Sequence, residues 1–78
     1  MLAEKKRELK ARYLKPKTKL RQLRRMRDIT TEQMAEAIGI ERRQYQKKEA
    51  GEYAFNDYEM VIISRELGES IEAIFYAD

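Results

Sequence analysis

The sequence contains no cysteine and no histidine. Without cysteine the chain forms neither a disulfide nor a thiolate metal site, and without histidine it lacks the usual zinc ligand and the commonest general base. We also find no nucleophile–base pair, no glycine-rich phosphate loop and no metal-ligand spacing. We therefore expect an aliphatic core with a few aromatic side chains, no enzymatic activity and no cofactor.

Long apolar runs are missing as well. No segment approaches the length of a membrane span, and the start of the chain lacks the apolar region of a signal peptide. The 78 residues are enough for one small domain. These features predict a cytoplasmic protein that does not act at a membrane.

Charge is distributed unevenly, although the net charge is only +3. Residues 1–28 hold twelve basic and three acidic side chains, whereas residues 52–78 hold one basic and seven acidic ones. The basic N-terminal segment favours a polyanionic partner, although a run of charged residues can equally be a solvated helix. A second basic segment at 42–48 favours nucleic acid as that partner.

Pro16 is the only proline and the strongest local breaker of the chain. It separates a basic N-terminal extension, residues 1–17, from a domain over residues 18–78. Residues 2–14 contain few apolar side chains. The extension is therefore predicted to be either a charged helix, marginal in isolation, or a flexible basic arm.

After Pro16 the periodicity predicts five short helices around one core and no strand, so the fold class is all-α. Thr30 with Gln33 reads as a capping box, and Gly39 suits a left-handed C-terminal turn. Three further positions are expected to begin helices, with side chains that can cap them: Thr18, Asn56 and Ser70.

Residues 29–51 predict a short helix, a tight turn at Gly39 and a second helix over about residues 42–50. This is the pattern of a helix-turn-helix, which presents its second helix to the DNA major groove. Arginine, lysine and glutamine pair with base edges and phosphates there. The exposed positions of the second helix carry Arg42, Arg43, Gln44, Gln46 and Lys47.

Residues 19–75 resemble the Cro/repressor (Xre-like) helix-turn-helix family. The matching pieces follow in the family's order without a gap: Leu20-Arg-Gln-Leu-Arg24, Ile29-Thr30, Met34-Ala35, Ile38-Gly39-Ile40, Glu49-Ala-Gly51, Leu67-Gly68 and Ile71-Glu-Ala-Ile-Phe75. The resemblance implies a compact five-helix domain that binds double-stranded DNA. It further implies a transcriptional regulator of phage or mobile-element type, expected to be a repressor.

The resemblance and the charge pattern together assign candidate site residues. Base contacts are expected from Arg42, Arg43, Gln44, Gln46 and Lys47. Phosphate contacts are expected from Lys19, Arg21, Arg25, Thr31, Gln33 and Tyr45. Of these, Tyr45 is expected first of all to pack inward. Arg24 and Glu49 match two positions that form a partly buried ion pair in some family members.

A homodimer is expected, because the last helix often forms the dimer contact in this family. The candidate interface residues are Ile62, Ile71, Ile74, Phe75 and Tyr76, although core packing explains several of them equally well. A dimer would read a pseudo-palindromic operator with half-sites about one turn apart. One departure concerns Lys48, which stands where the family places an apolar side chain and is expected to extend its amine into water.

Two other functions are compatible with the residues. Small proteins of this fold also act as antitoxins, and the acidic second half of the chain would suit a basic protein partner. A single-stranded nucleic-acid binder would need exposed aromatic side chains, for which Tyr13, Tyr53 and Tyr76 are candidates.

Overall fold

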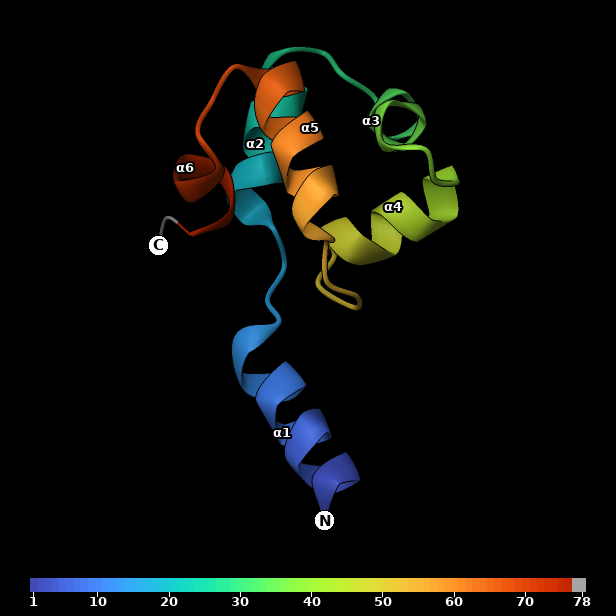
Figure 1. Cartoon of the computed structure of the whole chain (residues 1–78). Coiled ribbons are helices and arrows are strands. Elements are labelled where there is room, and N and C mark those ends of the chain that lie inside the picture. The colour runs from blue at the N-terminus through green and yellow to red at the C-terminus, as the bar shows by residue number, and fades with distance from the viewer. Residues whose placement is uncertain (77–78) are drawn as a thin grey trace.

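The computed structural model describes residues 1–76, which form six helices and no strand. The helices are α1 (Leu2–Tyr13), α2 (Thr18–Met26), α3 (Thr31–Ile38), α4 (Arg42–Glu49), α5 (Asp57–Leu67) and α6 (Ile71–Phe75). Helices α2 to α6 gather around one core, and α1 extends away from them (Figure 1). The predicted all-α class is confirmed, and the N-terminal extension is helical. Residues 77–78, the end of the predicted domain, lie outside the described residues.

The core is mainly aliphatic and includes a cluster of aromatic rings. The Phe55 ring lies 5.9 Å from that of Tyr45 and 5.5 Å from that of Phe75, both in edge-to-face geometry. The buried apolar residues are Leu20, Leu23, Met34, Ala35, Ile38, Tyr45, Phe55, Ile63, Leu67 and Ile74. They come from all five helices of the bundle and from the loop before α5, so each element contributes to one shared core.

Local sequence signals set several helix ends. The Thr30 side chain accepts a hydrogen bond of 3.0 Å from the Gln33 backbone N–H, and the Gln33 side chain accepts one of 2.8 Å from the Thr30 N–H. Gly39 follows α3 in the left-handed conformation at a φ of 75°. The Ser70 hydroxyl accepts a bond of 3.1 Å from the Ala73 N–H at the start of α6. These predicted caps are confirmed.

The start of α2 differs from the prediction. Thr18 is its first helical residue, and Lys17 stands at the capping position without a side-chain cap. The Lys17 backbone N–H donates a 2.8 Å hydrogen bond to the carbonyl oxygen of Glu49 at the end of α4. A contact between distant segments therefore fixes where α2 begins, and the expected Thr18 cap was wrong.

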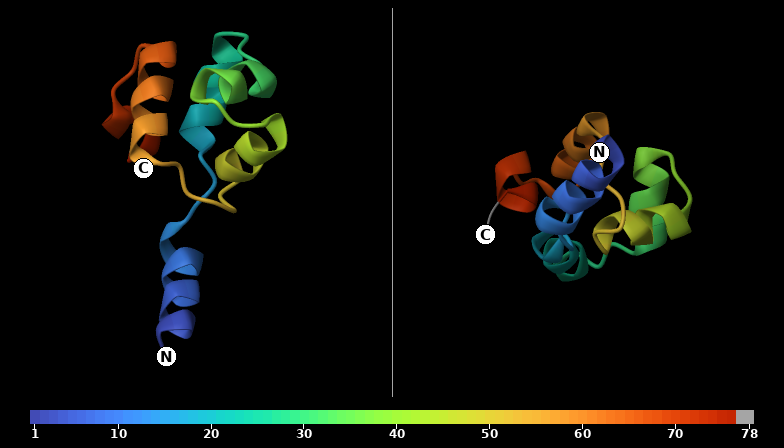
Figure 2. Two further views of the ribbon diagram at one scale, coloured as in Figure 1. Left: turned by 45° about the vertical axis from the view of Figure 1, so that its right-hand side comes forward. Right: turned by 90° about the horizontal axis from the view of Figure 1, so that it is seen from below.

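The segment between α1 and α2 is held against the end of α4. Gly51 has a φ of 88°, and a Cβ atom at this position would lie 2.6 Å from the Pro16 nitrogen and 2.7 Å from the Lys15 carbonyl carbon. Only glycine tolerates both the left-handed backbone and this close approach. The linker is anchored here, and α1 leads away from the bundle beyond the anchor (Figure 2).

No side chain of α1 is buried. The helix therefore receives no core packing from the rest of the described chain. None of the helices within residues 1–76 is both long and apolar enough to cross a membrane.

Candidate nucleic-acid interface

Helices α3 and α4 are joined by a turn of three residues, Gly39 to Glu41. The Ile40 N–H donates a 3.0 Å hydrogen bond to the Ala35 carbonyl oxygen, which closes this turn tightly. In Figure 1 α3 is seen end-on while α4 is seen from the side, so the two helices cross steeply. This is the arrangement of a helix-turn-helix, with α4 as the second helix.

The outer side of α4 is defined by what the helix buries. Tyr45 and Glu49, one turn apart, are its two buried residues. At about 100° per residue, Arg43, Gln44 and Lys47 lie within roughly 60° of the opposite direction. Three predicted base-contacting side chains therefore point outward together; Arg43 and Gln44 among them are exposed and Lys47 is half-buried.

Gln46 is exposed too but lies at the edge of this outer side, whereas Arg42, exposed in the first turn of α4, lies on the side of Tyr45 and Glu49. Neither arginine of α4 takes part in an ion pair with another residue of the described chain. Their guanidinium groups are therefore available to an external anion or base edge.

Tyr53, in the loop after α4, stands beside this surface. The Lys47 ammonium lies 5.8 Å from the centre of the Tyr53 ring, which is exposed. The sequence indicated Tyr53 only as a candidate for base stacking, because no helical periodicity places it beside Lys47. The tertiary structure adds it to the surface of α4 as a residue that orients Lys47 and presents a hydroxyl.

Glu49 fastens α4 to the bundle. Its carboxylate accepts two hydrogen bonds of 3.0 Å from the Arg24 guanidinium and one of 2.6 Å from the Tyr45 hydroxyl. Arg21 approaches the same carboxylate at 3.4 Å. Arg24 also donates to the Ile29 carbonyl oxygen at 2.9 Å, before α3. The expected pair of Arg24 and Glu49 is thus present, and it links α2 and α4 to the loop before α3.

These contacts shift the pKa values of all three groups. Burial raises the pKa of the Glu49 carboxyl, but hydrogen bonds from Arg24 and Tyr45 outweigh it and leave the pKa below its usual value. Burial, together with the charge of Glu49, raises the pKa of the Tyr45 hydroxyl. The hydrogen bond with Glu49 raises the pKa of Arg24. The cluster therefore holds a carboxylate, a neutral phenol and a guanidinium at neutral pH.

One predicted phosphate contact is corrected by this cluster. Tyr45 is 0% exposed and its hydroxyl already donates to Glu49, so it belongs to the core and has no surface to offer a phosphate. Arg21 is only half-exposed, and its guanidinium faces Glu49. Arg21 therefore contacts the same cluster, and its role as a phosphate contact stays a prediction.

Lys48 does not extend into water as expected. Its ammonium lies 2.7 Å from Glu59 Oε1, with 15% of the lysine side chain and none of the glutamate side chain exposed. Glu59 Oε1 also accepts a 2.8 Å bond from the Asn56 N–H at the start of α5. Lys48, which replaces the apolar residue of the family pattern, is therefore neutralised by the buried carboxylate of Glu59.

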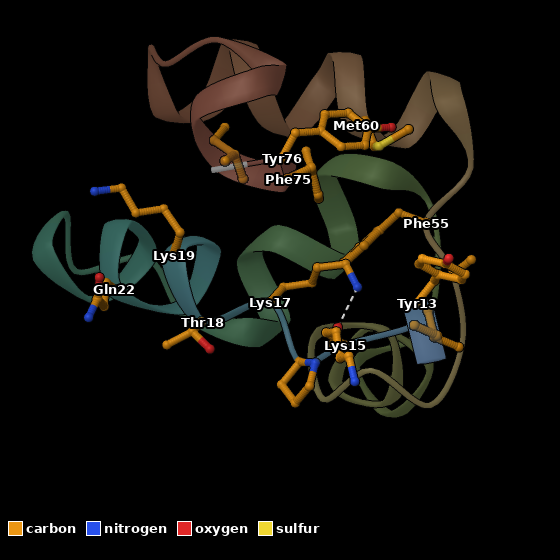
Figure 3. Close-up of a pocket in the computed structure, with 14 residues that line it drawn as sticks. Tyr13, Lys15, Lys17, Thr18, Lys19, Gln22, Phe55, Met60, Phe75 and Tyr76 are labelled. Carbon is orange, nitrogen blue, oxygen red and sulfur yellow. Dashed lines mark hydrogen bonds between the residues drawn. The ribbon is translucent and has the colours of Figure 1, made fainter. Parts of the chain in front are cut away.

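The other predicted phosphate contacts lie on different parts of the surface. Arg25 is exposed on α2, Gln33 is exposed in the first turn of α3, and Thr31 beside it is half-buried. Lys19 instead borders a groove of about 910 Å³ between the linker and α6. Figure 3 shows this groove with Lys15, Lys17, Lys19, Phe55, Met60, Phe75 and Tyr76 around it.

Lys17 forms the wall of that groove. Its ammonium donates a hydrogen bond to the Lys15 carbonyl oxygen (Figure 3), and partial burial lowers its pKa. The groove therefore combines an aromatic and apolar floor with a basic rim.

Most of the candidate dimer residues are used within the single chain. Ile74 is only 2% exposed and belongs to the core, so its assignment to a dimer interface was wrong. Ile62 and Phe75 pack against the core, and Ile71 is half-buried. Tyr76 alone of the five is exposed.

Comparison with known proteins agrees with this geometry. A helix-turn-helix family model matches residues 20–74, which begin in α2 and end in α6. No curated protein and no solved structure shows a significant match to the chain. Over most of its length, from the first buried leucine of α2 to the last buried isoleucine of α6, the chain is a member of the DNA-binding helix-turn-helix family of Cro/C1 type.

Proposed function

We propose that this protein is a transcriptional repressor that recognises a specific double-stranded DNA sequence as a homodimer. The observation that carries the proposal is the outer side of α4. There Arg43, Gln44 and Lys47 project together from a helix whose opposite side is locked into the core. Arginine can pair with guanine O6 and N7 at two points, and glutamine can do the same with adenine.

The ion cluster of Arg24, Tyr45 and Glu49 supports specific readout in a second way. A recognition helix discriminates bases only when its side chains are held at defined positions relative to the groove. The Glu49 carboxylate, at the C-terminal end of α4, is fixed by hydrogen bonds from α2 and from α4 itself. The helix therefore meets DNA without having to become ordered first.

Phosphate contacts would position the domain on the duplex. Arg25, Gln33 and Lys19 are exposed and are the residues proposed for this role. Each neutralised phosphate adds salt-dependent affinity without sequence information. Helix α4 would then supply the selectivity, and a bound dimer would block RNA polymerase from an overlapping promoter.

Selection of duplex DNA from a random library tests the proposal. We expect an enriched pseudo-palindrome that contains guanines, with half-site centres about one helical turn apart. The selected site and a shuffled duplex of the same composition should then be compared at two salt concentrations. Enrichment of no sequence, with weak binding to both duplexes that disappears in salt, would contradict the proposal.

The direction of regulation needs its own measurement. Purified RNA polymerase should transcribe a template that carries the selected site across a promoter. Repression predicts that transcript falls as the site is occupied and recovers when the site is shuffled. A rise in transcript on occupancy would establish activation instead.

A further inference from the structure

Helix α1 is attached to the bundle at the C-terminal end of α4. The Lys17 backbone N–H donates a 2.8 Å hydrogen bond to the Glu49 carbonyl oxygen, and Pro16 lies directly against Gly51. Beyond this attachment α1 runs away from the end of the bundle where the loop after α4 lies (Figures 1 and 2). Its 12 residues, at about 1.5 Å each, extend about 18 Å. A second element thus projects from the bundle beside the end of α4.

One side of α1 faces the loop after α4. Leu9, Lys10 and Tyr13 border a cleft between α1 and Ala54 of this loop. Leu9 is 41% exposed there, whereas Leu2, at the free end of the helix, is 90% exposed. At about 100° per residue, the three bordering residues of α1 span a sector of about 100° around the helix axis. We call this sector the loop-facing side of α1.

The loop-facing side is positively charged. Lys6 falls within the same sector as Lys10, and neither lysine forms an ion pair with another residue of the described chain. Glu4 and Glu8, the only acidic residues of α1, lie at least about 100° outside the sector. The loop itself adds a single acidic side chain, Glu52. The basic charge of α1 is therefore directed to the side on which the loop and α4 lie.

A polyanion that contacts α4 would meet this charge. Double-stranded DNA carries about one negative charge per 1.7 Å of its axis, so a helix about 18 Å long beside a duplex lies near several phosphates. The helix as a whole holds five basic and two acidic side chains. Its charge is thus complementary to the DNA backbone, and its position continues the surface of α4.

Two other partners agree less well with these features. A second copy of α1 would bring like charges together, which is unfavourable. Helices that bind a membrane surface present a broad apolar face. In α1 this face would consist of Leu2, Leu9 and Tyr13, of which two already border Ala54.

We propose that α1 binds the sugar–phosphate backbone of DNA that flanks the base pairs read by α4, with Lys6 and Lys10 as its main phosphate contacts. The inference rests on the proposed binding of duplex DNA through α4. It adds a sequence-independent contact from a helix that lies outside the helix-turn-helix domain. Because the linker is fixed against Gly51 at the end of α4, α1 is held on the same side of the bundle as the loop.

The salt dependence of DNA binding tests the proposal. Each phosphate contact contributes about 0.9 to the slope of log affinity against log salt concentration. The double variant Lys6→Gln with Lys10→Gln should lower this slope by about 1.8, so between about 50 and 200 mM salt it loses affinity about twelvefold less than the unsubstituted chain. Arg7→Gln with Arg12→Gln is the matched control. It removes the same charge from outside the loop-facing side, and we expect it to change the slope by less than about 0.5.

Both duplexes, the selected site and the shuffled one, are used in this assay. Phosphate contacts carry no sequence information, so the slope should fall equally on the two. Loss of slope in the Lys6 and Lys10 variant of a chain that selects no sequence would overturn the proposed function and support this inference. Equal slopes for the two double variants, in a chain that does select an operator, would overturn this inference alone.

Cleavage of DNA from a tethered reagent locates α1 on the duplex. Because the chain has no cysteine, iron–EDTA can be attached through Leu2→Cys, on the loop-facing side, or through Glu4→Cys, on the opposite side. On the selected site at saturating protein, we expect Leu2→Cys to cut the backbone just outside the half-site and Glu4→Cys to cut it far more weakly. Equal cutting from the two positions, or none from either, contradicts the contact.

Binding to lipid vesicles separates DNA from a membrane as the partner of α1. Vesicles of anionic phosphatidylglycerol should sediment little of the protein, as should vesicles of neutral phosphatidylcholine. Binding to the anionic vesicles that the Lys6 and Lys10 variant loses, while its slope on DNA stays unchanged, would assign α1 to a membrane surface and overturn the proposal.

Discussion

The hydroxyl of Tyr45 donates a 2.6 Å hydrogen bond to the carboxylate of Glu49, one turn later on the same helix. Both residues face the core, and the carboxylate is held from its other side by Arg24. The helix proposed to contact DNA is thus attached to the bundle through the residues on its inner side. Substitutions on the inner side of α4 should therefore change the stability of the fold, and substitutions on its outer side should change the proposed DNA recognition.

Tyr45→Phe should lower the free energy of unfolding by about 1.5–3 kcal/mol, the usual contribution of a hydrogen bond to a charged group. The operator affinity of the folded variant should not change, because the hydroxyl is buried away from the surface. Urea unfolding and binding to the selected duplex provide the two readouts. Unchanged stability together with weaker DNA binding would restore the phosphate contact expected from the sequence.

Arg24 and Glu49 should show strong coupling in a double-mutant cycle. Arg24→Gln and Glu49→Gln should each cost about 3 kcal/mol or more, because each leaves the partner's charge buried without compensation. The double variant should lose clearly less than the sum of the two. Thermal or urea unfolding of the four chains checks this, and additive losses would show that the two side chains do not stabilise each other.

Stability should fall in acid partly through Glu49. Its pKa is lower in the folded chain than the ordinary value of 4.5, so the unfolded chain takes up protons first. This contribution is fully present above about pH 4.5 and is lost as the pH falls through the folded pKa. Urea unfolding between pH 7 and pH 3 should therefore show a shallower pH dependence in Glu49→Gln, and parallel curves would contradict the assignment.

Lys48→Met should destabilise the fold by about 3 kcal/mol, because it leaves the Glu59 carboxylate buried without its cation. Adding Glu59→Gln should recover most of the loss, since the amide oxygen can still accept the bond from Asn56. Lys47→Met is the control at the neighbouring position, where no ion pair is present. Failure of Glu59→Gln to rescue would show that Lys48 acts through packing alone.

Arg43→Ala should reduce discrimination between the selected operator and a site with one guanine changed by roughly 1–3 kcal/mol. Arg65→Ala removes the same charge from α5, on a face away from α4, and should leave that discrimination intact. Fluorescence anisotropy with the two duplexes measures the difference. Equal effects of the two substitutions would reduce the role of Arg43 to electrostatic attraction.

Local sequence was sufficient wherever the physical cause was local. The caps at Thr30 and Ser70 and the left-handed turn at Gly39 depend on residues within three positions of one another, and they stand as predicted. The order of helices and the family pattern likewise follow from periodicity. The Arg24–Glu49 pair was reached through the resemblance, because nothing in the spacing alone joins residues 25 positions apart.

Tertiary structure decided the rest. Tyr45 was compatible with both the core and a phosphate until its hydroxyl was seen to donate to Glu49. Lys48 was expected in water, but α5 brings Glu59 within 2.7 Å of its ammonium. Ile74 was a candidate for a dimer contact, but the bundle buries it in the core. In each case the side chain had two chemically reasonable environments, and only the packing of distant helices determines which one it occupies.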